Sequence, residues 1–532
     1  MHRWLMALCA LLVVVACSDE EGAGPATTLA GSPTALGGGG AGGSPGGGGG
    51  GSTSDEICDN QTDDDGDGLA DCDDRDCALA DHCPPWCEAA EGARCYYVDA
   101  EDGDDAADGS FEHPFRTYLN LVTYYGTPGE LGSTAPPATA VDLQPGDAVY
   151  FMDGTYPETF NYHGDTEGFF ARGKDGDADH WFRLEAYPGQ QPVFRPGAPS
   201  GAIDLLQSSY WIVRGIEIDG ATQFGIWVVE TDQVELREVH IHDTDGVDNG
   251  NIAGLRMTSA TNVLVTGCTL NDNYDRTAED TGGQATENSS NMVAFGGGNI
   301  EISDCHVFNT LGIADDKLGG CLKYKHMRTL DGGTFVVRGN RLENCRFFSV
   351  GTGSPDSTIE GNLIQDSAPI SLRDFGGPTA LQNIRIRHNT MVNSPALSVN
   401  PDDGGDWVPL ADLEFSGNVT VDDEASYDTD RAMVRIGSYD SNEQHAIATA
   451  AGVMTFEQNC YHNPNTALVF DLFGADNFGD QGDLYDFAGW QGQGYDQSSF
   501  DEDPAFDGDL RATSANCAGL GYSNGPRAAA ER

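Results

Sequence analysis

The sequence predicts an all-β fold in which short strands wind into a coil of parallel rungs, three strands to a rung. Three observations predict it. A motif of alternating apolar residues, a turn and a second apolar pair recurs along the chain, and the apolar period inside each motif is two. One turn position is repeatedly asparagine. Helical solenoids are excluded because their apolar period is near 3.6.

The N-terminus carries an apolar segment, Trp4–Ala16, that is too short to span a bilayer as a mature helix. It ends in Val14-Val15-Ala16-Cys17, which resembles the bacterial lipoprotein box. The resemblance implies that residues 1–16 are a signal peptide and that Cys17 is lipidated. Ser18 then favours anchoring at the outer membrane of an exported protein. An ordinary secretory signal is the alternative.

Two small regions precede the repeats. Residues 17–55 are rich in glycine, with runs at Gly37–Gly40 and Gly46–Gly51, and are expected to form a disordered tether. Residues 56–95 form a module with six cysteines: Cys58, Cys72, Cys77, Cys83, Cys87 and Cys95. Export favours three disulfides of unknown pairing. A zinc site is the alternative, although His82 is the only histidine among these cysteines.

An acidic run inside this module has the spacing of a calcium loop. Alternate oxygen donors are supplied by Asp63, Asp65, Asp67, the Leu69 carbonyl, Asp71 and Asp74. Gly68 occupies the position of the sharp turn. The run resembles thrombospondin type 3 and EF-hand-like loops, which implies a structural calcium ion, with Asp74 in place of the bidentate Glu. A solvated acidic run without a metal is the alternative.

The repeats are marked by turn residues that we call anchors: Gly215, Glu238, Gly267, Asp304, Gly339, Gly361, His388, Gly417 and Gln458. Successive anchors are separated by between 22 residues (Gly339 to Gly361) and 41 residues (Gly417 to Gln458), as expected for rungs with loop insertions. The residue after the anchor forms a column: Cys268, Cys305, Asn340, Asn362, Asn389, Asn418 and Asn459. Stacked rungs place such residues about 4.8 Å apart, so the asparagine amides can hydrogen-bond along the stack. For Cys268 and Cys305, both a disulfide and a simple stack of small residues are open.

Residues 96–525 resemble right-handed parallel β-helix proteins of the pectin-lyase type. The opening segment Tyr96-Tyr97-Val98-Asp99, a helical stretch ending at Tyr125, the asparagine column and the closing segment around Trp490-Gln491 carry the resemblance. It implies a single-stranded right-handed parallel β-helix with a short N-terminal capping helix. It also implies one continuous domain.

Aligning the strand that precedes each motif places two columns of side chains on the outer face. The first column reads Trp227, Arg256, Ala294, Lys323, Ser349, Ser371 and Ser398. The second reads Val229, Thr258, Gly296, Lys325, Gly351, Arg373 and Asn400. Ile226, Leu255, Val293, Leu322, Phe348, Ile370 and Leu397 are expected to point inward. Cations therefore converge on one face, beside acidic loops.

Cations below carboxylate-bearing loops resemble the sites of β-helix polysaccharide lyases. The resemblance implies that Lys325 is the base, with Lys323 as the alternative, and that Arg373 holds the substrate or assists the leaving oxygen. Arg256, Trp227 and Asn400 would bind substrate, and calcium would be bound by Asp315, Asp316, Glu279 and Asp280. A salt-bridged surface without turnover is the alternative.

The charge limits the partners. The chain has 85 acidic and 27 basic residues, a net charge of −58, which makes nucleic acid an unsuitable partner. An acidic polysaccharide then requires calcium and the basic column to mediate contact. We expect a monomer whose only membrane contact is the lipid anchor. Two other functions stay open: a non-catalytic carbohydrate-binding adhesin, and a glycoside hydrolase, since Asp243-Thr244-Asp245-Gly246 faintly resembles a polygalacturonase motif.

Overall fold

The computed structural model describes most of the chain after the Gly-rich region. The described residues are 56–60, 62–65, 69–80, 82–123, 134–162, 165–197, 201–245, 252–274, 289–310, 320–325, 333–345, 347–350, 356–373, 381–400, 410–427, 432–438, 454–475 and 483–523. The predicted signal peptide, lipidated Cys17 and tether lie outside them. No helix within these ranges has the length and apolar character needed to cross a bilayer.

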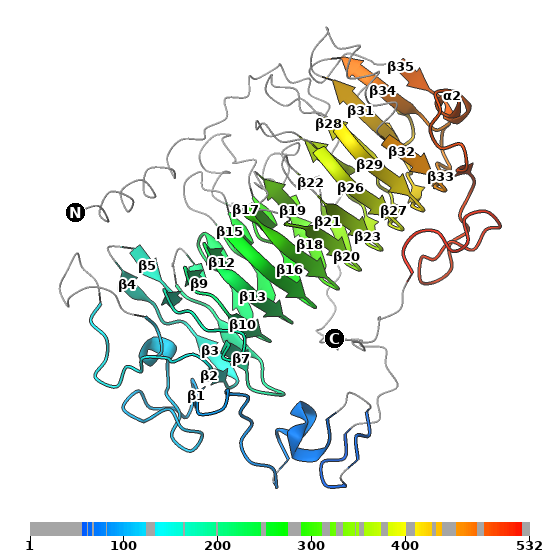
Figure 1. Ribbon diagram of the computed structural model, residues 1–532. Helices are drawn as coiled ribbons and strands as arrows, with labels where there is room; N and C mark the ends of the chain where they lie inside the picture. The colour runs from blue at the N-terminus through cyan, green and yellow to red at the C-terminus, as the bar shows by residue number, and fades with distance from the viewer. Residues whose placement is uncertain are drawn as a thin grey trace, which may run out of the picture. The chain divides into compact units, whose positions relative to one another are not determined.

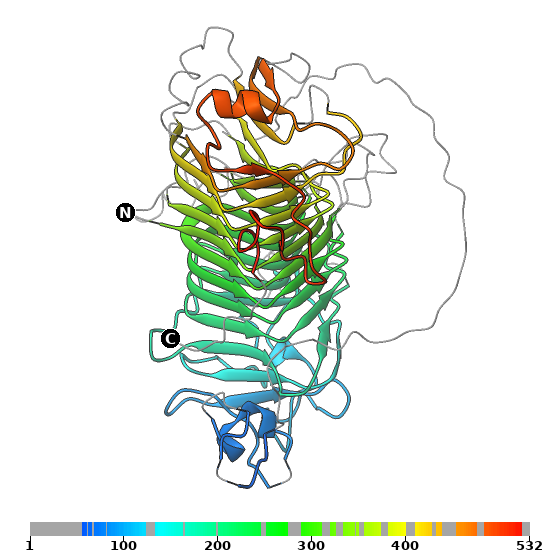
Figure 2. The ribbon, with the colours of Figure 1, turned by 90° about the vertical axis from the view of Figure 1, so that its right-hand side faces the viewer.

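The chain winds into rungs, and successive strands build three parallel stacks (Figures 1 and 2). The first stack contains β6 (Phe169–Arg172), β9 (Gly201–Leu206), β12 (Phe224–Val229), the first halves of β15 (Ala253–Thr266) and β17 (Ser290–Ser303), β19 (Gly320–Lys325), β22 (Phe347–Val350), β25 (Ile370–Arg373), β28 (Leu397–Asn400), β31 (Val434–Ser438) and β34 (Phe470–Ala475). The second contains β1 (Cys95–Val98), β2 (Ala148–Phe151), β7 (Phe182–Ala186), β10 (Trp211–Arg214), β13 (Asp232–Arg237), the second halves of β15 and β17, β20 (Phe335–Arg338), β23 (Ser357–Glu360), β26 (Leu381–Arg387), β29 (Leu410–Ser416) and β32 (Met454–Glu457).

The third stack is a separate 12-stranded sheet. It contains β3 (Gly154–Tyr156), β8 (Pro192–Phe194), β11 (Glu217–Asp219), β14 (His240–His242), β16 (Thr269–Asn271), β18 (His306–Thr310), β21 (Arg341–Cys345), β24 (Leu363–Gln365), β27 (Thr390–Val392), β30 (Val419–Val421), β33 (Cys460–His462) and β36 (Phe500–Asp501). The predicted all-β coil with three strands per rung is therefore confirmed.

The turn between the second and third stacks follows the predicted chemistry. Every anchor has a left-handed backbone, with φ between 53° and 70°. Such a conformation is cheap for glycine and costs most other residues free energy. The residue after each anchor then points inward and builds the predicted column.

The asparagine ladder (Asn340, Asn362, Asn389, Asn418 and Asn459) is continuous. The side-chain amide of each of the first four donates to the Oδ1 of the next asparagine, at 2.8–3.2 Å. Below it, the thiols of Cys268 and Cys305 are free, buried and stacked, with the Cys268 amide donating to the Cys305 sulfur at 3.4 Å. The stack of small residues is therefore observed, and the disulfide is not.

The interior of the coil is apolar. Strand alternation buries pairs such as Ile300 and Ile302 in β17 and Ile384 and Ile386 in β26, each exposed by 2% or less. The predicted inward residues Ile226, Leu255, Leu322, Ile370 and Leu397 are also buried. Burial of these side chains is the main favourable contribution to the free energy of folding.

The Cys-rich module packs on the N-terminal rungs. Arg75 donates to Glu185 of β7 at 3.0 Å, and Arg183 bridges Glu185 and Glu88 at 2.9 and 3.0 Å. The Glu185 side chain is fully buried, so these partners are needed to compensate for the loss of its hydration. A second contact joins the Trp86 amide to the Tyr187 hydroxyl at 3.1 Å.

Both ends of the coil are covered. Within residues 82–123, the segment expected to form the N-terminal capping helix forms a single 3₁₀ turn, η3 (Tyr118–Asn120). Its Tyr118 is buried and stacks on Phe194 at 5.2 Å. At the C-terminal end, α2 (Phe487–Gly492) buries Trp490, which stacks on Phe470 at 5.1 Å. A disulfide between Cys460 and Cys517 ties the closing segment to β33.

Candidate functional site

The outer face of the first stack carries one unbroken column of paired residues. The strand registers align Phe170, Asp204, Trp227, Arg256, Val293, Lys323, Ser349, Ser371, Ser398, Arg435 and Asp471. We call this set the outer column. Trp227 and Arg256 occupy neighbouring positions in it, and Val293 separates Arg256 from Lys323.

The predicted alignment is wrong by one residue in β17. Leu255 pairs with Met292, so Val293 rather than Ala294 lies in the outer column, and Phe295 rather than Gly296 pairs with Thr258. The register is set by the left-handed bend between the two halves of each long strand, at Ser259 in β15 and at Gly296 in β17. Counting back from this bend places Met292 and Ala294 inside, where both are 2% exposed or less.

Arg256 forms a patch with two aromatic rings. Its guanidinium carbon lies 5.0 Å from the centroid of Phe224, whose ring is 5.1 Å from that of Trp227. Its Nε donates to the Thr258 hydroxyl at 3.2 Å. Burial lowers the pKa of Arg256, because the charged form loses hydration there. Phe224 is buried, whereas Trp227 and Arg256 are partly exposed and can contact an anionic sugar through a ring face and a positive charge.

Lys323 is covered although it lies on the outer face. It is 4% exposed, and its aliphatic stem folds over Gly320, where an added Cβ would lie 2.7 Å from the Lys323 Cε. Lys325 follows two residues later in β19, and Arg373, which pairs with Asn400, follows Ser371 by two residues in β25. That Lys325 and Arg373 share the face of Lys323 stays a prediction from strand alternation.

Several predicted residues lie outside the described part. The side chains of Lys325, Arg373 and Asn400 are not among the described ones. The same holds for the whole of Glu279, Asp280, Asp315 and Asp316, the expected ligands of a site calcium.

A pair of buried carboxyl groups lies at the N-terminal end of the outer column, and sequence reasoning missed it. Asp204 is 2% exposed, and Glu167, from the hairpin of β4 (Phe160–Tyr162) and β5 (Asp165–Glu167), is 7% exposed. Burial, together with the neighbouring Glu167 charge, raises the pKa of Asp204 well above its usual value. Both causes favour the neutral, protonated form of Asp204. The signal in the sequence is an aspartate between Ile203 and Leu205.

The predicted calcium loop is partly assembled. The carboxylates of Asp65 and Asp74 come together with that of Glu56, with ligand atoms within 4.8 Å of one another. Glu56 also accepts hydrogen bonds from the amides of Asp64 and Asp71, at 2.8 and 3.0 Å. Sequence reasoning missed Glu56 because it precedes the contiguous motif.

For the other predicted ligands of this loop, calcium binding stays a prediction. Asp63 and Asp71 are not part of the carboxylate group, and Asp71 instead accepts from the Asn60 amide at 2.8 Å. Leu69 is 44% exposed, and Asp67 lies outside the described residues.

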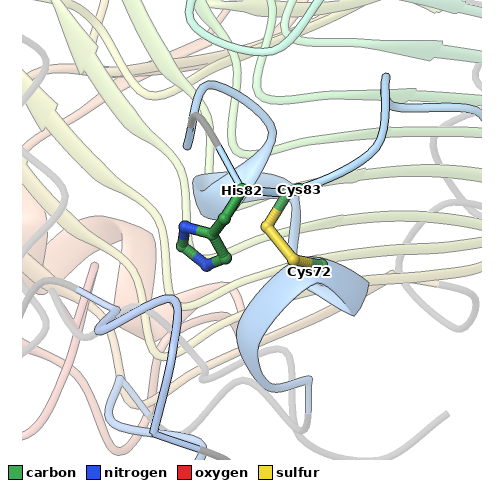
Figure 3. A group of neighbouring side chains, drawn as sticks. All are labelled: Cys72, His82 and Cys83. Atoms are coloured by element: carbon green, nitrogen blue, oxygen red, sulfur yellow. A yellow bond between two sulfur atoms is a disulfide. The ribbon is translucent and has the colours of Figure 1, made fainter.

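The six cysteines of the module form three disulfides, as expected: Cys58–Cys77, Cys72–Cys83 and Cys87–Cys95. Figure 3 shows His82 beside the Cys72–Cys83 bond. Its Nε2 lies 2.5 Å from the Cys58 carbonyl oxygen. Because both sulfurs are consumed in the bond, the zinc alternative for this module is wrong.

A second cluster of polar side chains lies on the third stack. Glu217 and Asp219 of β11 pair with His240 and His242 of β14. Ile218 and Ile241, between them, are buried, so the four polar side chains point outward. The sequence signal is an alternating Glu-Ile-Asp followed one rung later by His-Ile-His, in strands that the sequence alignment did not include.

Comparison with known proteins places the chain by its fold. Solved structures that resemble it include a GH136 lacto-N-biosidase from Eubacterium ramulus (15% identity, 76% of this chain and 67% of that chain, TM-score 0.35). They also include pectate lyase Pel9A (14% identity, 66% and 80%, TM-score 0.37) and the surface adhesin PfbA of Streptococcus pneumoniae (12% identity, 62% and 81%, TM-score 0.36). We derive no activity from them. No curated protein sequence matches.

The family model described as "Right handed beta helix region" matches residues 201–469, about half of the chain. This range contains the outer column from Asp204 to Arg435 and all nine anchors from Gly215 to Gln458. The pairing of strands and the family match agree on a right-handed parallel β-helix. The chain therefore belongs to the right-handed β-helix family.

Proposed function

We propose that this protein is an exported, lipid-anchored protein of the bacterial outer membrane that binds an acidic polysaccharide along the outer column. We further propose that it cleaves the polymer by calcium-dependent β-elimination. The observation that carries the proposal is the register that aligns Arg256, Lys323 and Arg435 on one face.

The spacing of these cations suits a chain of carboxylates. Serines occupy the outer column between Lys323 and Arg435, at positions 349, 371 and 398. Rungs repeat at about 4.8 Å, so small polar side chains leave room for a polymer between the cations. Arginine binds carboxylates through two parallel hydrogen bonds, which suits it to uronic acids. In a chain of net charge −58, aligned cations would lower the local repulsion of a polyanion.

In the proposed reaction, the Lys325 amine, in its neutral form, removes the C5 proton of a uronate. The C5–H electrons form the C4–C5 double bond as the C4–O4 bond breaks, and the leaving oxygen takes up a proton. Arg373 holds the substrate or assists that oxygen. Lys323, which is covered by its fold over Gly320, is the alternative base. Trp227 and Asn400 would bind neighbouring sugars.

Calcium has two proposed places. In the Cys-rich module, the three carboxylates of Glu56, Asp65 and Asp74 supply the oxygen donors that this cation prefers. Near the outer column, Glu279, Asp280, Asp315 and Asp316 would hold it. There, calcium would neutralise the uronate carboxylate and so make the C5 proton more acidic.

One observation favours a second candidate, a non-catalytic adhesin. The patch of Phe224, Trp227 and Arg256 combines aromatic faces with a cation and contains no group that transfers a proton at neutral pH. Such a patch binds sugars without turnover.

The full chain, incubated with alginate, pectate and glycosaminoglycans, tests the proposal. We expect the ultraviolet absorbance of unsaturated uronate to appear with calcium and to disappear when calcium is chelated. Lys325→Ala should lower the rate by about 100-fold or more, as loss of a general base does. Arg387→Ala, which removes a cation paired with Glu360 on the second stack, is the matched control and should leave the rate unchanged.

The remaining outcomes separate the candidates. Binding to a polymer without any absorbance change would support the adhesin and reject the lyase. Activity that survives both Lys325→Ala and Lys323→Ala would reject the assigned site while keeping the reaction.

A further inference from the structure

The third stack carries a cluster of imidazole and carboxylate groups that the proposed function does not use. The outward side chains of Glu217 and His240 are paired across adjacent rungs, as are those of Asp219 and His242. Three potential ligand atoms, one each from Glu217, His240 and His242, lie within 4.8 Å of one another. We propose that these three residues bind a zinc ion.

The distances fit the coordination of zinc. The Glu217 Oε1 lies 3.2 Å from the His242 Nε2, and the two imidazole centroids are 4.5 Å apart. Two ligand atoms that are each about 2.0–2.1 Å from a tetrahedral zinc ion are about 3.3 Å apart. Glu217 and His242 therefore hold nearly the separation that a shared zinc requires. The backbone already holds the three residues together, since β11 and β14 are hydrogen-bonded strands of one sheet.

Each histidine has one ring nitrogen held by an oxygen. The His242 Nδ1 lies 2.8 Å from the Asp243 carboxylate, and the His240 Nε2 lies 2.9 Å from the Asn271 Oδ1. When the imidazole donates its N–H to that oxygen, the other nitrogen presents its lone pair to a metal. A histidine oriented in this way by a carboxylate or carbonyl is the usual arrangement around protein-bound zinc.

The neighbouring residues decide between the two carboxylates of β11. Asp219 is engaged by Arg195, whose Nε donates to it at 2.8 Å. Glu217 makes its described contact with His242 instead. Two imidazoles with one carboxylate favour zinc over calcium or magnesium, which prefer oxygen donors alone. The fourth position is left to water or to a ligand.

Metal titration of the full chain tests this site. After removal of metals with a chelator, we expect one Zn²⁺ to bind per chain by calorimetry. Co²⁺ at the same site should give the intense visible absorption of a tetrahedral ion. His240→Ala and His242→Ala should each abolish this binding, and Asp243→Asn should weaken it by about 10–100-fold.

His306→Ala is the matched control. His306 lies on the same sheet, two strands beyond His240, and its Nε2 faces Glu343 at 3.5 Å without a second histidine. It should leave zinc binding unchanged. Stoichiometric binding that survives His242→Ala, or the absence of binding in a wild-type chain with the circular dichroism of a folded β protein, would overturn the proposal. In the second case, the side chains of the cluster only hydrogen-bond to one another and bind no metal.

Discussion

Asp204 is an acidic residue placed where its charge is unfavourable. Its carboxyl is buried on β9 and faces Glu167, and both causes raise the pKa of Asp204. The raised pKa favours a protonated Asp204 carboxyl in the folded protein at pH values above about 3.9, where an aspartate in the unfolded chain has lost its proton. Because the folded state binds more protons in this range, the free energy of unfolding falls as the pH rises.

We predict that Asp204→Asn stabilises the protein at pH 8 more than at pH 4, since the amide stays neutral at both. The difference between variant and wild type should grow by up to about 1.4 kcal/mol for each pH unit between the unfolded and folded pKa values of Asp204. Chemical denaturation at a series of pH values measures it. Asp102→Asn, at an exposed position, is the control and should show no such trend. A difference in unfolding free energy that does not change with pH would contradict a raised pKa of Asp204 in the folded protein.

At the scale of the element, the asparagine ladder converts one turn type into a continuous hydrogen-bonded column. The Asn389 Oδ1 accepts from the backbone amide of Asn362 at 3.0 Å, and the Asn389 Nδ2 donates to the Ile359 carbonyl oxygen at 2.9 Å. The side chain of Asn389 is fully buried. Its removal would leave these buried backbone groups without a partner. Such groups cost about 1–3 kcal/mol each.

Asn389→Ala should therefore lower the free energy of unfolding by roughly 2–4 kcal/mol. Equilibrium denaturation gives the value. Asn516→Ala removes an exposed side-chain hydrogen bond to Glu502 and should cost less than about 1 kcal/mol. Equal losses in the two variants would mean that the ladder contributes no more than a surface contact.

The elements also show what could be predicted from the sequence. The anchors and the ladder were predictable because glycine recurs at five of the nine left-handed anchors and asparagine recurs directly after five of them. The register of β17 was not, because Met292 and Val293 are both apolar and only the bend at Gly296 decides between them. Glu167 and Glu56 were missed because each reaches its site from a segment outside the repeated motif.

At the scale of the whole molecule, charge opposes the compact state. The net charge of −58 is offset within the described rungs by cross-strand pairs such as Arg338–Glu301 and Arg387–Glu360. These pairs use a large share of the few cations. The remaining carboxylates repel one another, and dissolved salt screens this repulsion.

We predict that the thermal midpoint rises by several degrees when sodium chloride is increased from about 10 mM to about 500 mM, because screening relieves repulsion more than it weakens the ion pairs. Calorimetry in the presence of a calcium chelator separates screening from calcium binding. An equal concentration of potassium chloride should have the same effect. A falling midpoint would show that the ion pairs outweigh the repulsion.

The uniform chemistry of the asparagine ladder bears on how such a molecule changes length. At every step from Asn340 to Asn459, the side-chain Nδ2 of one asparagine donates to the Oδ1 of the asparagine in the next rung. A whole turn of the coil can therefore be duplicated or deleted in its middle without creating a new interface. The two ends are different: Asn340 accepts from the backbone amide of Cys305, and Asn459 meets Asp496 and Ser499. Growth of the architecture is thus open in the interior of the ladder and closed at its two ends.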